Sequence, residues 1–185
     1  MKKTFLTLIS LFCFSNISQS TEAFNYEIRT APIALLARWG TLDFSLNINT
    51  QWALGPSVII YAAPKVGQMF APSYSGTAIG GHLYYYLNSF SENSWYWGNH
   101  LYAESYQSYP HAMNGHYEYS GYKLNSKFGY QFTHSSGFNM LLGAGAELRN
   151  YAQKNIDDSS GANTPSFNDY QPVIPFIEMK FGYKF

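Results

Sequence analysis

Cysteine is almost absent: the 185-residue chain contains one, Cys13. It lies inside an apolar run from Phe5 to Phe14 and follows Phe12 rather than a small residue, which argues against a lipoprotein processing site. If the N-terminal run is removed on export, the mature chain has no thiol. A disulfide framework is therefore excluded as the source of its stability.

Charge is also scarce, since only 12% of residues are charged and Lys plus Arg equal Asp plus Glu at 11 each. No basic patch indicates a nucleic-acid partner, and no glycine-rich phosphate loop joins a strand to a helix. Beyond the N-terminal run, no stretch approaches the roughly 20 apolar residues of a membrane helix. Aromatic residues, by contrast, make up 19% of the chain.

The N-terminal segment has the layout of a secretory signal peptide. Lys2 and Lys3 precede an apolar run of about ten residues, too short for a membrane helix, and small polar residues follow. Ser18 and Ser20 favour cleavage after Ser20, with Ala23 as an alternative. We predict a signal peptide over residues 1–20 and a single domain over 21–185.

The end of the chain, PVIPFIEMKFGYKF, alternates between apolar and polar residues. Phe185, Tyr183 and Phe181 share one face, while Lys184 and Lys180 share the other. This period of two predicts a strand over residues 172–185 that runs to the last residue.

Seven further segments have strand character, at residues 25–37, 41–48, 53–63, 77–88, 95–107, 122–132 and 138–149. Short connections (49–52, 90–93, 133–137) alternate with long ones (64–76, 110–120, 154–170), and only the link at 38–40 departs from this order. The pattern predicts an all-β fold: an eight-stranded antiparallel up-and-down barrel. Because one face of each strand is apolar, we expect a transmembrane barrel in the outer membrane of a Gram-negative-type bacterium, in contact with lipid and lipopolysaccharide.

The last strand resembles the sorting signal of outer-membrane barrel proteins, at Met179, Phe181, Tyr183 and Phe185. The stretch EIRTAPIALLARWGTLDFSL is similar to the start of small barrels of the OmpA/OmpX-like superfamily. This resemblance implies that the barrel-assembly machinery reads the C-terminal strand. It implies a location and no particular activity.

The predicted inner faces collect acidic and basic residues in balance. They are Glu27, Arg29, Asp43, Glu104, Lys123, Lys127, Glu147, Arg149, Glu178 and Lys180. An eight-stranded barrel has an interior that side chains fill, and buried charges need partners. We expect an ion network that plugs the lumen and leaves no channel; the alternative is a proton path or a catalytic carboxylate pair.

One segment carries residues of hydrolytic chemistry. His134 and Ser136, with Glu147 further along, resemble the pattern of outer-membrane lipid A deacylases, in which Ser attacks an ester, His acts as base and Glu orients it. The other interpretation is a serine-rich hairpin turn, which we favour, because Glu147 lies about ten residues up the next strand.

Two further clusters admit a binding role. His111, His116 and Glu118 fall in one predicted outer loop and could ligate a transition metal, although exposed histidines are more often unliganded. The aromatic run Tyr84–Tyr86 with Trp95 and Trp97 could bind sugar, but an interfacial girdle is favoured. We expect no cofactor, and a structural or surface-interaction role whose ligand the sequence does not name.

Overall fold

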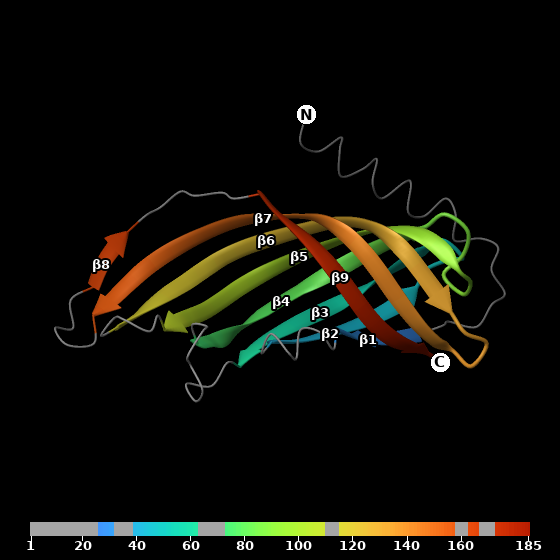
Figure 1. Ribbon diagram of the computed structural model, residues 1–185, viewed down its shortest axis with the longest axis horizontal. Coiled ribbons are helices and arrows are strands. Elements are labelled where there is room, and N and C mark those ends of the chain that lie inside the picture. Colours follow the sequence, from blue (N-terminus) through green and yellow to red (C-terminus); the bar gives the residue numbers. More distant parts are fainter. Residues whose placement is uncertain (1–25, 32–38, 63–72, 110–114, 158–162, 167–172) are drawn as a thin grey trace.

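In a computed structural model, the described residues are 26–31, 39–62, 73–109, 115–157, 163–166 and 173–185, and they form nine strands (Figure 1). The strands are β1 Tyr26–Thr30, β2 Trp39–Asn47, β3 Trp52–Ala62, β4 Ser73–Tyr86, β5 Ser94–Tyr109, β6 Gly115–Thr133, β7 Phe138–Asp157, β8 Asn163–Ser166 and β9 Val173–Lys184. None of these residues belongs to a helix long and apolar enough to cross a membrane.

Eight of the strands close into an antiparallel barrel. Consecutive strands pair from β1 to β7, β7 then pairs with β9, and β9 pairs with β1. The short β8 adds only to the far end of β7, between Gln153 and Ile156. The predicted fold class, an eight-stranded antiparallel up-and-down barrel, is therefore confirmed.

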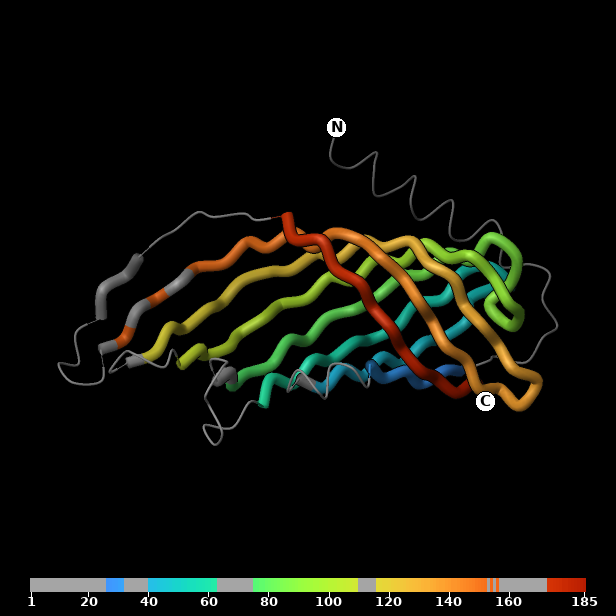
Figure 2. The backbone as a smooth tube through the Cα atoms, viewed as in Figure 1, coloured from blue at the N-terminus to red at the C-terminus, as the bar shows by residue number. Residues whose placement is uncertain are grey.

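The two ends of the barrel wall meet at the last residue. Tyr26 and Phe185 exchange both backbone hydrogen bonds, each at 2.9 Å, and the Lys184 N–H donates to Gly137 O at 3.0 Å. The C-terminus therefore lies beside the start of β1, as Figure 2 shows. This closure gives the backbone of the last two residues hydrogen-bond partners on both sides, at Tyr26 and at Gly137.

Strand lengths differ from the prediction at the end of the barrel that carries the long connections. β1 ends at Thr30, and residues 32–37 of the strand predicted over 25–37 lie outside the described residues; the expected tight link at 38–40 is wrong at its last two positions, because Trp39 and Gly40 belong to β2. β6 begins at Gly115 and β7 reaches Asp157, so both extend well beyond their predicted bounds. Their ends project past the neighbouring strands (Figure 1).

The distribution of apolar and charged side chains in this barrel is the reverse of that in a soluble protein. Large apolar side chains face outward along every full strand, with Ile177 at 87%, Ile79 at 65% and Leu101 at 57% exposed. Charged and hydroxyl-bearing side chains point inward, and Glu27, Arg29 and Asp43 are wholly buried. Because successive side chains in a strand alternate in direction, the sequence pattern produces both faces at once.

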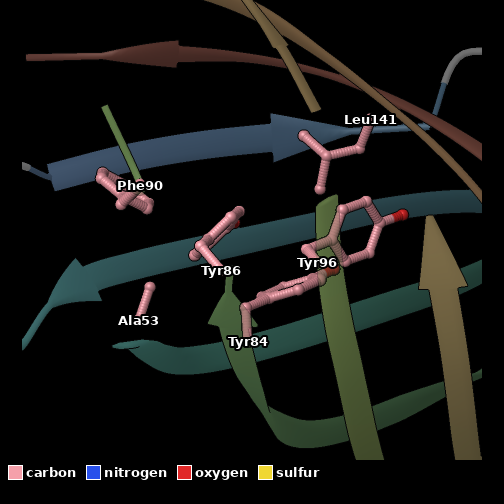
Figure 3. Packing of buried hydrophobic residues seen from close by; sticks show 6 residues of the cluster. All are labelled: Ala53, Tyr84, Tyr86, Phe90, Tyr96 and Leu141. Carbon is pink, nitrogen blue, oxygen red and sulfur yellow. The ribbon is translucent and has the colours of Figure 1, made fainter. Parts of the chain in front are cut away.

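The end with short turns is sealed from within. The β4–β5 turn folds under the barrel, where Phe90 N–H donates to Thr50 O at 2.7 Å and Gln131 Nε2 donates to Phe90 O at 2.8 Å. The Phe90 ring is fully buried beside Tyr86, with their centroids 5.5 Å apart (Figure 3). This packing closes the lumen at that end.

Close contact between strands makes a glycine necessary on the inner face of β4. A Cβ on Gly80 would lie 1.9 Å from the carbonyl oxygen of Leu101 in β5. We expect Gly80→Ala to lower the free energy of unfolding by about 1–3 kcal/mol, because the β4 backbone must shift. Urea denaturation followed by tryptophan fluorescence measures this.

The neighbouring Gly81 supplies the matched control. Its Cβ would meet nothing closer than Gly55 O at 3.3 Å, so Gly81→Ala should change stability much less. Equal losses of unfolding free energy in the two variants would show that the close approach of β4 and β5 is not the reason for a glycine at position 80.

Candidate functional site in the barrel lumen

The innermost charged pair lies on β1. Glu27 and Arg29 are two residues apart and therefore share the inward face, and both are fully buried. The Arg29 guanidinium donates to both oxygens of Glu27 and to Tyr86 Oη at 2.6 Å. It also lies 4.7 Å from the centroid of the Tyr84 ring. Arg29 is therefore held by a bidentate ion pair and by aromatic faces.

A second group of charges joins three strands across the lumen. Lys180 on β9 donates to Asp43 Oδ2 on β2 at 2.6 Å and lies 2.8 Å from Glu178 Oε1. Glu178 also pairs with Lys127 on β6. These contacts cross the barrel from wall to wall, so they fill the cross-section as well as neutralise charge.

A third group lies toward the long connections. Glu104 accepts hydrogen bonds from Tyr61 and Tyr151, and Lys123 Nζ is 3.3 Å from Glu104 and 4.0 Å from Glu147. Arg149 pairs with Glu147. All ten residues predicted to form the lumen network thus take part in ion pairs, although Glu178 and Arg149 keep 18% and 30% of their side chains exposed.

Two buried histidines belong to this interior, and sequence reasoning missed them. The two ring nitrogens of His82 form hydrogen bonds with the hydroxyl groups of Ser45 and Ser57, at 2.9 and 2.8 Å. Those of His100 form hydrogen bonds with the hydroxyl groups of Tyr84 and Tyr102, at 2.8 and 2.7 Å. The strand period could have found them, because His82 precedes Tyr84 by two residues and side chains two residues apart in a strand share a face.

His82 and His100 also lie near Asp43, and one ligand atom from each of the three falls within 4.8 Å of the others. Such a set could hold a metal ion. However, each ring nitrogen already has a hydroxyl partner, and Lys180 occupies Asp43 Oδ2. The cationic neighbour and the hydroxyl partners of all four ring nitrogens fit a structural polar layer better than a metal centre, although Asp43 Oδ1 has no hydrogen-bond partner among the described residues.

The aromatic run does not lie as predicted. Tyr84 and Tyr86 are fully buried in the lumen, where their rings pack with that of Tyr96 (Figure 3). The predicted girdle is therefore wrong for these two tyrosines, whereas Trp95 and Trp97 do face outward at 48% and 53% exposure. Inside the lumen, the hydroxyl groups of Tyr84 and Tyr86 have polar partners in His100 and Arg29, respectively.

The residues of the hydrolase pattern are only partly brought together. His134 Nδ1 and Ser136 Oγ lie 2.9 Å apart in the exposed β6–β7 turn, where Gly137 adopts a φ of +90°. Glu147 instead lies within the barrel, opposite Asn125 and bound to Arg149 and Lys123. No Ser–His–Glu triad forms from these described residues, and the Ser–His contact stabilises a hairpin turn.

The predicted metal loop is also different in the structure. His116 and Glu118 lie on β6 instead of in a loop, with His116 Nε2 3.6 Å from Glu118 Oε1, and Gln107 donates to the same oxygen at 3.2 Å. His111 lies outside the described residues. The loop was predicted too long because β6 continues in polar residues beyond the end of the apolar pattern.

The four residues of the predicted assembly signal lie on β9 and at the chain end. Tyr183 and Phe185 are exposed on the outer surface, and Met179 and Phe181 are half-buried there. Phe185 stacks on Tyr26, with the ring centroids 6.1 Å apart, and Tyr26 stacks on Phe44.

One cavity of about 300 Å³ opens beside the third charged group, between β9 and the ends of β1 and β2.

Comparison of the chain with protein-family models, with curated proteins and with solved structures found no match. The function must therefore be inferred from the geometry of the barrel itself.

We expect Arg29→Met to lower the free energy of unfolding by about 3–5 kcal/mol, because Glu27 would remain as a buried carboxylate without its cation. Replacing the carboxylate as well, in Glu27→Gln with Arg29→Met, should recover much of the loss. Denaturant unfolding of both variants beside the parent chain measures the difference.

Arg149→Ala is the control for a less buried ion pair, because the Arg149 side chain is 30% exposed and Glu147 still has Lys123 Nζ at 4.0 Å when Arg149 is removed. We expect it to weaken the fold by about 1 kcal/mol or less. Two results would contradict the claim that burial sets the strength of the network. One is a loss of unfolding free energy in Arg149→Ala as large as that in Arg29→Met. The other is a Glu27→Gln/Arg29→Met double variant that is no more stable than Arg29→Met alone.

Proposed function

We propose that the protein is an integral outer-membrane β-barrel with a structural or surface-interaction role, whose charged lumen is plugged and forms no channel. The observation that carries this proposal is the inversion of the barrel, with ion pairs inside and large apolar side chains outside. A soluble barrel would expose this apolar surface to water, whereas in lipid the same surface is favourable.

Aromatic residues on the outer surface support a membrane setting. Near the short turns, outward rings from neighbouring strands contact one another, as in the pairs Trp52–Tyr85, Trp95–Tyr130 and Phe138–Phe181. The Trp and Tyr rings among these pairs are part apolar and part polar, and such rings favour the boundary between lipid and water. We interpret this band as the girdle at the periplasmic boundary.

Export and insertion complete the proposal. Residues 1–20 would direct the chain across the inner membrane, and the C-terminal strand with Phe185 would be read by the barrel-assembly machinery, as the resemblance to OmpA/OmpX-like barrels implies. The closed backbone pairing of Phe185 with Tyr26 fits a last strand that completes the wall.

The extended ends of β4–β7 support a role at the cell surface. Beyond the apolar band their outward residues become polar, including Thr77, Ser105, Glu118 and Lys154, which line a hollow of about 660 Å³. Polar outward positions fit strands that rise above lipid into water and the lipopolysaccharide head groups. Any specificity would lie on these ends and in the loops between them.

Two competing functions receive less support. A pore needs an open path, but Arg29, Tyr84, Tyr86 and Phe90 are buried together across the lumen. A lipid A hydrolase needs a catalytic constellation, but Glu147 is engaged in ion pairs away from the turn of His134 and Ser136. We therefore propose neither.

We expect the protein in the outer-membrane fraction, with an N-terminus that follows Ser20 and with a gel mobility that changes on boiling. The reason is that a closed barrel held by continuous backbone pairing resists detergent until it is heated. Membrane fractionation, N-terminal sequencing and electrophoresis of heated and unheated samples measure these properties.

Recovery in the soluble periplasmic fraction without a mobility shift would contradict the proposal, and would indicate a soluble barrel with an internal ligand cavity. Stepwise ion conductance of the purified protein in a planar bilayer would contradict the plugged lumen. Loss of an acyl chain from the lipid A of cells that express the gene would favour the hydrolase instead.

A further inference from the structure

The cavity between β9 and the ends of β1 and β2 has walls of two chemical kinds. Its inner wall is formed by lumen residues, including Tyr102, Lys123, Asn125 and Arg149. Its outer wall is formed by β9, where Ile174 and Phe176 face inward and Ile177 and Met179 face outward. A single space therefore links the polar lumen to the apolar outer surface.

The position of the cavity follows from the pairing of β9. Residues Phe181–Lys184 pair with Glu27–Thr30 of β1, whereas the cavity lies against the preceding part of β9, which pairs with β7. Ala31, the last described residue after β1, also lines the cavity and donates to Thr41 Oγ1 at 3.1 Å. The cavity thus adjoins the seam at which the barrel closes.

The polar end of the cavity offers a hydrogen-bond acceptor without a donor. Asn125 Oδ1 is buried, and no donor among the described residues reaches it, although unpaired buried oxygens are costly. The charges beside it are already matched, because Arg149 pairs with Glu147 and Lys127 pairs with Glu178. The site therefore suits an uncharged group that donates a hydrogen bond better than an ion.

The size of the cavity limits its occupant. About 300 Å³ holds on the order of ten heavy atoms, at roughly 30 Å³ each. This is room for a small hydroxyl-bearing head and the first carbons of a chain. A longer chain would leave the barrel past Ile177, which is 87% exposed on the outer surface.

We propose that this cavity binds a single-chain lipid with an uncharged, hydroxyl-bearing head. A head hydroxyl donates to Asn125 Oδ1, the first carbons lie against Ile174 and Phe176, and the rest of the chain continues along Ile177 and Met179. This inference rests on the proposed membrane setting, because the chain needs hydrocarbon outside the barrel.

The test uses the folded protein in detergent micelles, titrated with a monoacylglycerol and read by native mass spectrometry. We expect one bound molecule per barrel, and binding lost in Ile174→Trp, whose indole fills the cavity. Asn125→Leu, which keeps the volume but removes the acceptor, should weaken binding about five-fold, the loss of one hydrogen bond. Leu101→Trp, on the outer surface away from the cavity, is the matched control and should bind like the parent chain.

Equal binding by Ile174→Trp and Leu101→Trp, or tighter binding of the free fatty acid than of the monoacylglycerol, would overturn the proposal. The heat-dependent mobility shift is recorded for each variant. Protein that shifts on heating but binds no monoacylglycerol refutes the lipid site alone, whereas protein without the shift refutes the membrane barrel itself. A photoreactive monoacylglycerol supplies a second readout, and even labelling around the barrel instead of labelling concentrated on residues 174–179 would also overturn the site.

Discussion

The pairing of buried charges inside a closed wall is the constraint on which the rest of the structure depends. Asp43 and Lys180, 2.6 Å apart and almost fully buried, come from strands at opposite ends of the sequence. A buried charge without a partner costs several kcal/mol, so each inward charge requires the strand that carries its partner. A shift of one strand by one residue would place its charges on the apolar outer surface and its apolar side chains in the lumen, and the network therefore specifies register.

The same constraint connects folding to the proposed role. β1 brings Glu27 and Arg29, β9 brings Glu178 and Lys180, and the two strands meet where Phe185 pairs with Tyr26. Closure at Phe181–Lys184 therefore brings together the backbone of β1 and β9 and the charges that both strands place inside. The barrel is sealed by Arg29 and Phe90 at one end, and the hollow at the extended ends of β4–β7 is lined by polar side chains, which fits the proposed role at the cell surface.

Period-two alternation accounts for what the sequence could predict. Lys123 and Lys127 oppose Leu124 and Phe128 on β6, so the number of barrel strands, the faces of the clearly alternating strands and the balance of inward charge could be read from the residues. Which charges pair could not be read, because Lys180 and Asp43 are 137 positions apart in the sequence and meet only in the closed barrel.

Other features were hidden because the pattern is ambiguous. Tyr84 and Tyr86 lie inside and Trp97 outside, yet aromatic residues suit both environments, so the run alone could not assign the faces. The far part of β6, with His116 and Glu118, was mistaken for a loop, since a strand that leaves the apolar band loses its alternation. The cavity at the seam is lined by residues of six strands, which no local sequence pattern brings together.

The central claim is that the apolar face meets lipid while the charged face is sealed. Spin labels on single cysteines introduced in turn at Tyr122, Lys123, Leu124, Asn125, Phe128 and Gly129 of β6, in a chain whose only native cysteine is Cys13, test it most directly. In bilayers, labels at 122, 124 and 128 should collide readily with dissolved oxygen and poorly with an aqueous nickel chelate, and labels at the alternate positions should collide poorly with both. Ready collision of the outward labels with the chelate would contradict the membrane barrel.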